Sequence, residues 1–371
     1  MLLKQLISRA GKQLVQESVE ALYLKTGFDA TRPIAIRGQV NERCNYKCRY
    51  CRFWRKDDYV REMSIEQWQN ALSSLKSFIG SYVIQFSGGE PFIKTGFLDL
   101  LEFCHREKIG WGVITNGSAF NRHTVERTIA ARPTNIDISV DAATPDIHDF
   151  VRGVPGSLER ITRGIELLRT QRQQEGLDFP IRIKPTVHQL NFRYLPQLVE
   201  WAQQMGATTI DFSPVRPGYK IPEVETELWL HDRRDIETLE RTIETLVEMK
   251  RQGAPIETSE AKLRGFSDHF ARKTVYHGVS PCRVSLREYF IDPTGNVIMC
   301  WFYPPIGNVK TQEARDIWYD PKTRQQRSQM VGCSKFGSVS CANSCLTHRS
   351  FPQEVKRGLL MLKRSRVRQH S

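Results

Sequence analysis

The chain carries Cys44-Asn45-Tyr46-Lys47-Cys48-Arg49-Tyr50-Cys51, a run with the spacing Cys-x3-Cys-x2-Cys. A cubane iron-sulfur cluster has four irons and is normally closed by four thiolates, so a loop with three thiolates leaves one iron open to another ligand. The next candidate ligands, Cys104 and His105, fall in an expected helix. The run therefore predicts a reactive cluster. The alternative is a structural zinc site, which needs a fourth protein ligand.

On the C-terminal side of residue 34, short apolar runs alternate with amphipathic stretches. This alternation predicts repeated strand-helix units and a parallel sheet. We expect strands at 34–40, 82–86, 111–115, 135–140, 181–187 and 208–212, and helices at 64–77, 95–107, 120–131, 156–172 and 194–205. Six strands are too few to close an eight-stranded barrel. The expected fold is therefore α/β, a partial (β/α)6 TIM-like barrel.

Polar motifs follow the first four expected strands. The cysteine loop follows the first, Ser87-Gly88-Gly89-Glu90-Pro91 the second and Asn116 the third, while Ser139 and Asp141 end the fourth. The carboxyl ends of parallel barrel strands meet at one mouth, where active sites collect. Glycine after a strand lets the backbone approach a ligand that a Cβ would block. We therefore expect the functional site at this mouth.

The cysteine run and the Gly-Gly-Glu motif together resemble the radical S-adenosylmethionine (radical SAM) enzymes, over roughly residues 34–350. The resemblance implies the partial barrel and a [4Fe-4S] cluster with an open iron site that chelates S-adenosylmethionine (SAM). It also implies reductive cleavage of SAM to a 5'-deoxyadenosyl radical, which abstracts hydrogen from a substrate. An external electron donor such as flavodoxin or ferredoxin would reduce the cluster.

The resemblance also implies a set of SAM-binding residues, namely Tyr50, Gly88, Gly89, Glu90, Asn116, Ser139, Asp141 and Arg152. The Gly-Gly-Glu motif would hold the methionine ammonium, and Tyr50 would lie near the adenine. The strand end at 139–141 would contact the methionyl carboxylate and the ribose. For two of these residues, a structural role explains the sequence as well as SAM binding does. Arg152 fits a surface salt bridge, and Asn116 fits a turn or a helix cap.

A second group of cysteines occupies the C-terminal region: Cys282, Cys300, Cys333, Cys341 and Cys345. The spacing Cys-x12-Gly-x4-Cys at its start resembles the SPASM and Twitch domains, which hold auxiliary iron-sulfur clusters. Five thiols suffice for one auxiliary [4Fe-4S] cluster with one thiol left over. A zinc ribbon is the alternative.

The spare thiol suggests a mechanism. If it is Cys333 or Cys341 and faces the substrate, it could return a hydrogen atom to a substrate radical and so epimerise the carbon. If the auxiliary cluster instead collects an electron, the product is oxidised or cross-linked. Which of the five cysteines is spare cannot be read from the spacing, although Cys282, Cys300 and Cys345 fit a ligand role best.

We divide the chain into an N-terminal amphipathic helix (1–33), the barrel (34–230), a linking helix with an irregular connection (231–280), a cysteine-rich domain (281–350) and a basic tail (351–371). The first part carries an apolar stripe of Leu3, Ile7, Ala10, Leu14 and Ala21. Such a stripe predicts a helix that packs against the barrel. The alternative is a helix that lies on a membrane surface.

Composition narrows the class of protein. The 371 residues are 40% hydrophobic and 26% charged, which is typical of a globular protein. There is no run of 18 apolar residues and no signal peptide, so we expect a cytoplasmic protein with reduced cysteines. The net charge of +13 permits an acidic partner. A non-catalytic iron-sulfur or zinc protein that binds nucleic acid is therefore a remote alternative to an enzyme.

The expected substrate is a peptide or a small natural-product precursor. Peptide-maturing relatives often carry a leader-recognition domain before the barrel, and 33 residues are too few for one. Either a separate peptide-recognition protein serves this chain, or the substrate is an aminocyclitol, a sugar or a lipid.

Overall fold

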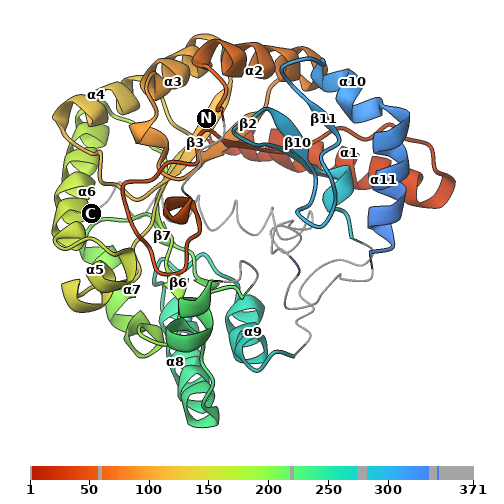
Figure 1. Cartoon of the computed structure of the whole chain (residues 1–371). Helices are drawn as coiled ribbons and strands as arrows, with labels where there is room; N and C mark the ends of the chain where they lie inside the picture. The colour runs from red at the N-terminus through yellow and green to blue at the C-terminus, as the bar shows by residue number, and fades with distance from the viewer. Residues whose placement is uncertain (1, 57–60, 218–220, 274–281, 334–340, 342–371) are drawn as a thin grey trace.

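The computed structural model describes residues 2–56, 61–217, 221–273, 282–333 and 341. Its centre is a curved sheet, and the helices form an arc around the outer side of that sheet (Figure 1). The described strands of the sheet follow the order β11-β10-β9-β1-β2-β3-β4-β5-β7, and those from β9 to β7 run parallel. This is the α/β partial barrel that the sequence predicts.

The strands of the main sheet are β1 (Ala35–Gln39), β2 (Val83–Ser87), β3 (Gly110–Thr115), β4 (Asn135–Ile138), β5 (Ile181–Ile183), β7 (Thr209–Ile210), β9 (Glu288–Ile291), β10 (Asn296–Ile298) and β11 (Gly307–Asn308). A short parallel pair comprises β6 (Thr186–Val187) and β8 (Ser213–Pro214). The helices are α1 (Leu2–Thr26), α2 (Ile65–Ile79), α3 (Phe97–Arg106), α4 (Arg122–Ala130), α5 (Pro145–Arg152), α6 (Ser157–Gln174), α7 (Leu195–Gln204), α8 (Arg233–Arg251), α9 (Glu260–Phe270), α10 (Ala314–Tyr319) and α11 (Pro321–Val331).

The two faces of the sheet differ in chemistry because side chains alternate along each strand. Gly38 of β1 faces α2, where a Cβ would lie 3.0 Å from the ring of Trp68. Arg37 and Gln39 therefore face the opposite, inner side. On β4, Ile136 and Ile138 are fully buried in the apolar core and alternate with polar residues. The inner face of this open barrel is thus largely polar.

The strands and helices expected up to residue 252 all form, with small shifts at their ends. The expected strand 181–187 is split into β5 and β6. Pro185 lies between the two pieces and has no N–H to donate to a strand ladder. The helix α2 begins at a capping box, in which Ser64 and Gln67 satisfy each other's backbone N–H groups.

The sequence led us to expect an irregular connection at 253–280. The structure shows instead that part of this connection is helical. Residues 260–270 form helix α9, capped by the Ser259 side chain, which accepts from the Lys262 N–H. Leu263, Phe266 and Phe270 of this helix are buried. Turn-forming residues on both sides of α9 obscured its short apolar period.

The C-terminal region extends the barrel sheet. Strand β9 lies parallel to β1, with Ala35 opposite Glu288 and Arg37 opposite Phe290. Strands β10 and β11 then continue the sheet in antiparallel fashion. The cysteine-bearing segment is therefore held at a fixed position beside the first barrel strand.

Helix α1 forms as expected, but in its described half the buried face is not the apolar stripe. Glu20 is fully buried and Leu14 is 50% exposed. Glu20 accepts hydrogen bonds from Arg287 (Nη2 to Oε2, 2.6 Å) and Arg283 (3.1 Å). Gln16 donates to the Leu286 carbonyl (3.2 Å). Ion pairing with residues 283–287 thus fixes this part of the helix. The side chains of 3, 7 and 10 lie outside the described residues.

No described helix combines the length and apolar character that crossing a membrane would need.

Candidate functional site

The cysteine loop follows β1 and is tied to the end of helix α5. The Lys47 N–H donates to the Arg152 carbonyl (3.1 Å), and the Arg49 N–H donates to the Val151 carbonyl (2.9 Å). The helix ends at Gly153, whose φ is +68° and where a Cβ would lie 2.5 Å from the Lys47 carbonyl oxygen. Glycine is therefore required at this contact.

The same loop is anchored from across the barrel. The Arg49 guanidinium forks onto Glu227 (Nε to Oε2 2.8 Å, Nη2 to Oε1 2.7 Å), and Arg55 contacts Glu223 (2.8 Å). Both glutamates belong to or adjoin a short π-helix, Val224–Leu228. Sequence reasoning missed these anchors, because no motif connects residues that are 178 and 168 positions apart.

Gly88 and Gly89 lie against the backbone that leads into the cysteine loop. A Cβ at Gly88 would lie 2.2 Å from Asn41 Oδ1, and one at Gly89 would lie 1.9 Å from the Arg43 carbonyl oxygen. The Gly89 N–H also donates to the Asn41 carbonyl (3.1 Å). We expected glycine here to admit a ligand, and the structure supplies a different reason, the close approach of the chain itself.

The three thiols of the loop interact electrostatically with one another. Burial raises the pKa of Cys44 to about 11 and that of Cys48 to about 12, and it also raises the pKa of Cys51. N–H donors face two of the sulfurs. Asn116 Nδ2 lies 3.9 Å from Cys44 Sγ, and Arg152 Nη1 lies 3.8 Å from Cys48 Sγ. Such donors stabilise negative charge on cluster sulfurs.

In the part of the chain that the structure describes, no three His, Cys, Asp or Glu side chains converge closely enough to hold a single metal ion. A zinc site needs ligands that converge on one point. The thiolates of a cubane cluster instead bind separate irons. The coupled thiols with their N–H donors thus fit a cluster, and they do not form a preassembled zinc site.

Glu90 and Asn116 form a connected group beside Cys44. Glu90 is fully buried and accepts hydrogen bonds from the Thr115 hydroxyl (2.7 Å), the Asn116 N–H (2.7 Å) and the Phe92 N–H (3.2 Å). Burial outweighs these donors and raises the pKa of Glu90 to about 7. The carboxylate is therefore held rigidly at the mouth of the barrel.

A second group surrounds Asp141, beside Cys48. The fully buried carboxylate accepts from the Tyr50 hydroxyl (2.9 Å) and the Thr186 N–H (2.9 Å), and it pairs with Arg152 (Nε to Oδ2, 2.9 Å). Burial alone would raise the pKa of Asp141, but Arg152 and its other polar neighbours lower it below the usual range. The surface reading of Arg152 is wrong, because only 6% of its side chain is exposed.

The structure thus brings most of the expected SAM-binding residues into two groups, one at Cys44 and one at Cys48. Ser139 lies just beyond β4, is half-buried, and donates its backbone N–H to the Thr115 carbonyl (3.0 Å). The SAM contacts of these residues stay predictions. The Asp141 carboxylate already has three partners inside the chain, namely Tyr50, Thr186 and Arg152.

The distal cysteines form a third group. Cys300 interacts electrostatically with Cys282, Cys333 and Cys341, and burial raises its pKa. The fifth distal cysteine, Cys345, lies outside the described residues. The four described thiols are sufficient in number for one four-cysteine cluster.

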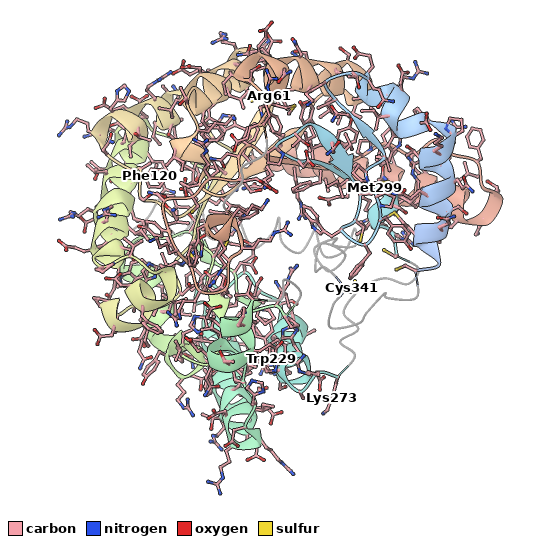
Figure 2. All side chains as sticks on the ribbon, in the orientation of Figure 1. Arg61, Phe120, Trp229, Lys273, Met299 and Cys341 are labelled. Carbon is pink, nitrogen blue, oxygen red and sulfur yellow. The ribbon has the colours of Figure 1, made fainter. Side chains whose placement is uncertain are left out.

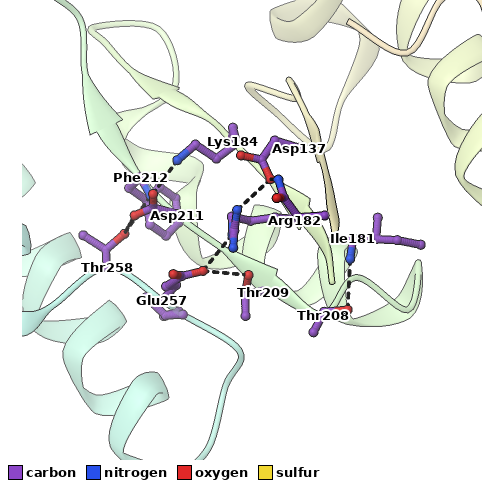
Figure 3. A network of polar contacts seen from close by, with 12 residues as sticks. Asp137, Ile181, Arg182, Lys184, Thr208, Thr209, Asp211, Phe212, Glu257 and Thr258 are labelled. Atoms are coloured by element: carbon purple, nitrogen blue, oxygen red, sulfur yellow. Dashed lines mark hydrogen bonds and ion pairs between the residues drawn. The ribbon is translucent and has the colours of Figure 1, made fainter. Parts of the chain in front are cut away.

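The inner face also carries a charged network that no motif predicted (Figure 3). Arg182 of β5 donates to Asp137 of β4 (2.7 Å) and to Glu257 (2.7 Å). Lys184, directly after β5, pairs with Asp211, directly after β7. These pairs cross-link β4, β5 and β7, the strands at the open edge of the sheet.

Comparisons with known proteins agree with this arrangement. The sequence model of the radical SAM superfamily matches residues 39–179, and that of the SPASM iron-sulfur cluster-binding domain matches residues 282–346. Among curated proteins, the chain is 26% identical to an AdoMet-dependent heme synthase of Methanosarcina barkeri (77% of this chain, 82% of the relative). It is also 26% identical to a mycofactocin maturase of Mycobacterium ulcerans (88% and 85%).

Two solved structures share the fold. Streptococcus suis SuiB bound to its precursor peptide SuiA has a TM-score of 0.64 at 16% identity, over 84% of this chain and 70% of that one. Native anSMEcpe with bound AdoMet has a TM-score of 0.59 at 16% identity, over 90% of this chain and 98% of that one. With its two family matches covering the cysteine loop and the distal cysteines, the chain belongs to the radical SAM superfamily and carries a SPASM-type iron-sulfur domain.

Proposed function

We propose that this protein abstracts a hydrogen atom from a peptide substrate, with oxidation or cross-linking of that peptide as the outcome. Members of the superfamily are enzymes that use a [4Fe-4S] cluster and SAM, and a SPASM domain implies an auxiliary iron-sulfur cluster. When bound, these groups supply a 5'-deoxyadenosyl radical and an electron acceptor. The observation that carries the proposal is the rigidly anchored loop with three electrostatically coupled thiols.

In this proposal Cys44, Cys48 and Cys51 hold the SAM cluster. The N–H groups of Asn116 and Arg152 donate to its sulfur ligands. The Gly-Gly-Glu turn at 88–90 contacts the methionine ammonium at the barrel mouth. Asp141 acts mainly as a positioning residue, because it fixes both Tyr50 and Arg152 beside Cys48.

The auxiliary cluster is assigned to Cys282, Cys300, Cys333 and Cys341, because these thiols are grouped in the structure. This grouping supports ligand roles for Cys333 and Cys341, the two candidates for a hydrogen-donating thiol. It therefore favours oxidation or cross-linking over epimerisation. The electron donor and a separate peptide-recognition protein stay predictions.

The peptide reading is supported by the mycofactocin maturases and by a PqqA peptide cyclase of Granulibacter bethesdensis, 24% identical over 57% of this chain. The second candidate is a haem-forming reaction on a tetrapyrrole. It is favoured by the heme synthase of Methanosarcina barkeri and a similar one from Oleidesulfovibrio alaskensis, 25% identical over 87% of this chain.

The test is anaerobic reconstitution with iron and sulfide, followed by reduction and an assay for 5'-deoxyadenosine. We expect about eight irons per chain from two cubane clusters, and reductive cleavage of SAM. Cys48→Ala should abolish the cleavage. Cys104→Ala is the matched control, because Cys104 is a fully buried thiol of α3 outside both cysteine groups. Its cleavage activity should persist.

Substrate candidates are then compared in the same assay. Stimulation of SAM consumption together with a loss of two mass units from a precursor peptide supports the proposal. Consumption driven by an iron tetrapyrrole and not by peptides supports the second candidate. A fully reconstituted wild type that never cleaves SAM contradicts both.

A further inference from the structure

A pocket opens on the inner face of the sheet, where β1 meets the C-terminal strands. It is a shallow pocket that is partly open to solvent. Its walls include Arg37, Arg216, Glu288, Phe290, Cys300 and Trp301. Met299 also lines it, and Figure 2 labels this residue on the inner side of the ring of elements.

The polar wall of the pocket contains an unsatisfied acceptor. Glu288 is 3% exposed, and its Oε1 pairs with Arg37 Nε at 3.0 Å. Its Oε2 is buried and has no hydrogen-bond partner among the described residues. A buried carboxylate oxygen without a donor is energetically costly. A ligand that brings a hydrogen-bond donor to Oε2 would satisfy the ionised form of this carboxylate.

A donor without a partner lies on the other side of Arg37. Gln85 of β2 is in register with Arg37, and its Nε2 is buried with no partner in the described structure. The Gln85 Oε1, in contrast, accepts from Asn135 (3.1 Å). Three neighbouring strands thus present an acceptor, a guanidinium and an amide N–H on the same inner face.

Another part of the pocket wall is apolar and aromatic. Phe290 and Trp301 meet edge to face, with ring centroids 4.8 Å apart and an interplanar angle of 66°. Trp301 is 48% exposed although it follows directly after Cys300. A large exposed aromatic beside a polar pocket suits a ligand that has both an apolar body and a polar end.

We propose that this pocket binds a backbone amide and the adjacent side chain of the peptide substrate. The amide N–H donates to Glu288 Oε2, the carbonyl oxygen accepts from Arg37, and the side chain packs on Phe290 and Trp301. This inference rests on the proposed function and adds the recognition chemistry of its substrate.

The alternatives match less of the pocket. A bare carboxylate, such as that of a tetrapyrrole side chain, satisfies the arginines but brings no donor to Glu288. A sugar brings donors and acceptors but a less apolar body. The pocket also touches Cys300, one of the grouped distal thiols, so a peptide bound here lies next to the proposed auxiliary cluster.

The test measures binding of N-acetyl-L-phenylalaninamide to the full-length protein by saturation-transfer NMR and calorimetry. We expect millimolar binding to the wild type. The same compound with every amide nitrogen methylated has no N–H, and it should bind at least about tenfold more weakly, the smallest loss expected for one hydrogen bond to a charged group. Glu288→Met should weaken binding of the unmethylated probe by a similar factor, and Trp301→Ala should weaken it too.

Glu257→Gln is the matched control. Glu257 is also a largely buried inner-face carboxylate, with 11% of its side chain exposed. Its Oε2 already contacts Arg182 (2.7 Å) and Thr209 (3.1 Å), and it does not line the pocket. Probe binding should be unchanged. If Glu288→Met does not fold, which a thermal melt reveals, the methylated probe still tests the same contact on the wild type.

Equal binding of the two probes, or tighter binding of N-acetylglucosamine than of the peptide probe, overturns the inference. Cleavage of SAM by the reconstituted wild type in the absence of any substrate tests the proposed function separately. If SAM is cleaved and the probe contact fails, only the inference is lost. If the probe contact holds and SAM is never cleaved, the pocket still binds a peptide amide, but the proposed function is lost and with it the claim that this peptide is a substrate.

Discussion

Asp141→Asn should destabilise the metal-free protein by about 3 kcal/mol, the lower end of the cost of breaking a buried ion pair. The substitution keeps the shape of the side chain and removes its charge. Only 6% of the Arg152 side chain and none of the Asp141 side chain is exposed. The variant therefore leaves a guanidinium buried without its counter-ion.

The magnitude follows from the contacts that remain. An asparagine oxygen still accepts from the Thr186 N–H. Its NH₂ group, however, now faces the Tyr50 hydroxyl and the Arg152 guanidinium, which both donate to the carboxylate in the wild type, so donor meets donor. Arg152 keeps its contact with Cys48 Sγ. The unpaired Arg152 accounts for most of this cost. The double variant Asp141→Asn with Arg152→Met should therefore be at least about 1 kcal/mol more stable than the sum of the two single effects predicts.

The assay is urea unfolding of the reduced, metal-free protein at pH 7, followed by tryptophan fluorescence. The matched control is Glu159→Gln, which breaks an exposed pair with Arg163 (71% and 65% exposed) and should cost at most about 0.5 kcal/mol. The folded-state pKa of Asp141 is lowered, so its stabilising effect is present above the unfolded-state pKa of 3.8 and is lost as the pH falls through the folded value. A cost below about 1 kcal/mol at pH 7 would refute the reasoning.

Three further outcomes are expected. Gly89→Ala should cost at least about 2 kcal/mol and reduce the iron bound on reconstitution, because its Cβ would lie 1.9 Å from the Arg43 carbonyl oxygen. Glu20→Gln should cost about 3 kcal/mol and expose helix α1 to limited proteolysis, because it leaves the buried Arg287 without its carboxylate. Burial lowers the pKa of His269 to about 4 from 6.5, so the folded state binds fewer protons than the unfolded state, and unfolding free energy should decrease as the pH falls from 6.5 to 4. His269→Phe should reduce this loss of unfolding free energy by up to about 3 kcal/mol. The measurement is urea unfolding at several pH values across that range.

Controls separate these effects from general loss of stability. Gly11→Ala is matched to Gly89→Ala, because a Cβ at Gly11 meets nothing within 4 Å, and it should leave the protein as stable or slightly more stable. Glu159→Gln is also the control for Glu20→Gln, because it removes the charge of a carboxylate in an exposed ion pair. A Gly89→Ala protein with wild-type stability and iron content would contradict the close-approach argument. A pH slope unchanged by His269→Phe would show that other groups carry the acid sensitivity.

Much of the barrel could be predicted because its signals are local. The run from Asn135 to Asp141 alternates polar and apolar residues, and such a period of two defines a strand with one buried face. The three cysteines and the turn at 88–90 were correctly placed after β1 and β2 for the same reason. Helix α9 was missed because its apolar residues are few and lie between turn-forming segments.

The roles of charged residues could not be predicted in this way. Arg152 read equally well as a surface residue, because its sequence neighbours do not reveal that Asp141 and Cys48 face it. Helix α1 has an apolar stripe, yet Glu20 is fully buried, because two arginines from residues 283–287 neutralise it. In both places an ion pair overrides the pattern of hydrophobicity.

The amino-acid sequence by itself determined the α/β class, the order of the barrel elements and the position of the thiols after the first strand. These features follow from periodicity and from short motifs, which act between residues close in the chain. Only the tertiary structure decided that β9 joins β1, that Asp141 holds Tyr50 and Arg152, and that Glu288 keeps an unsatisfied oxygen in a pocket. The physical reason is that burial of a charge, and the partner it finds, depend on contacts between segments tens to hundreds of residues apart.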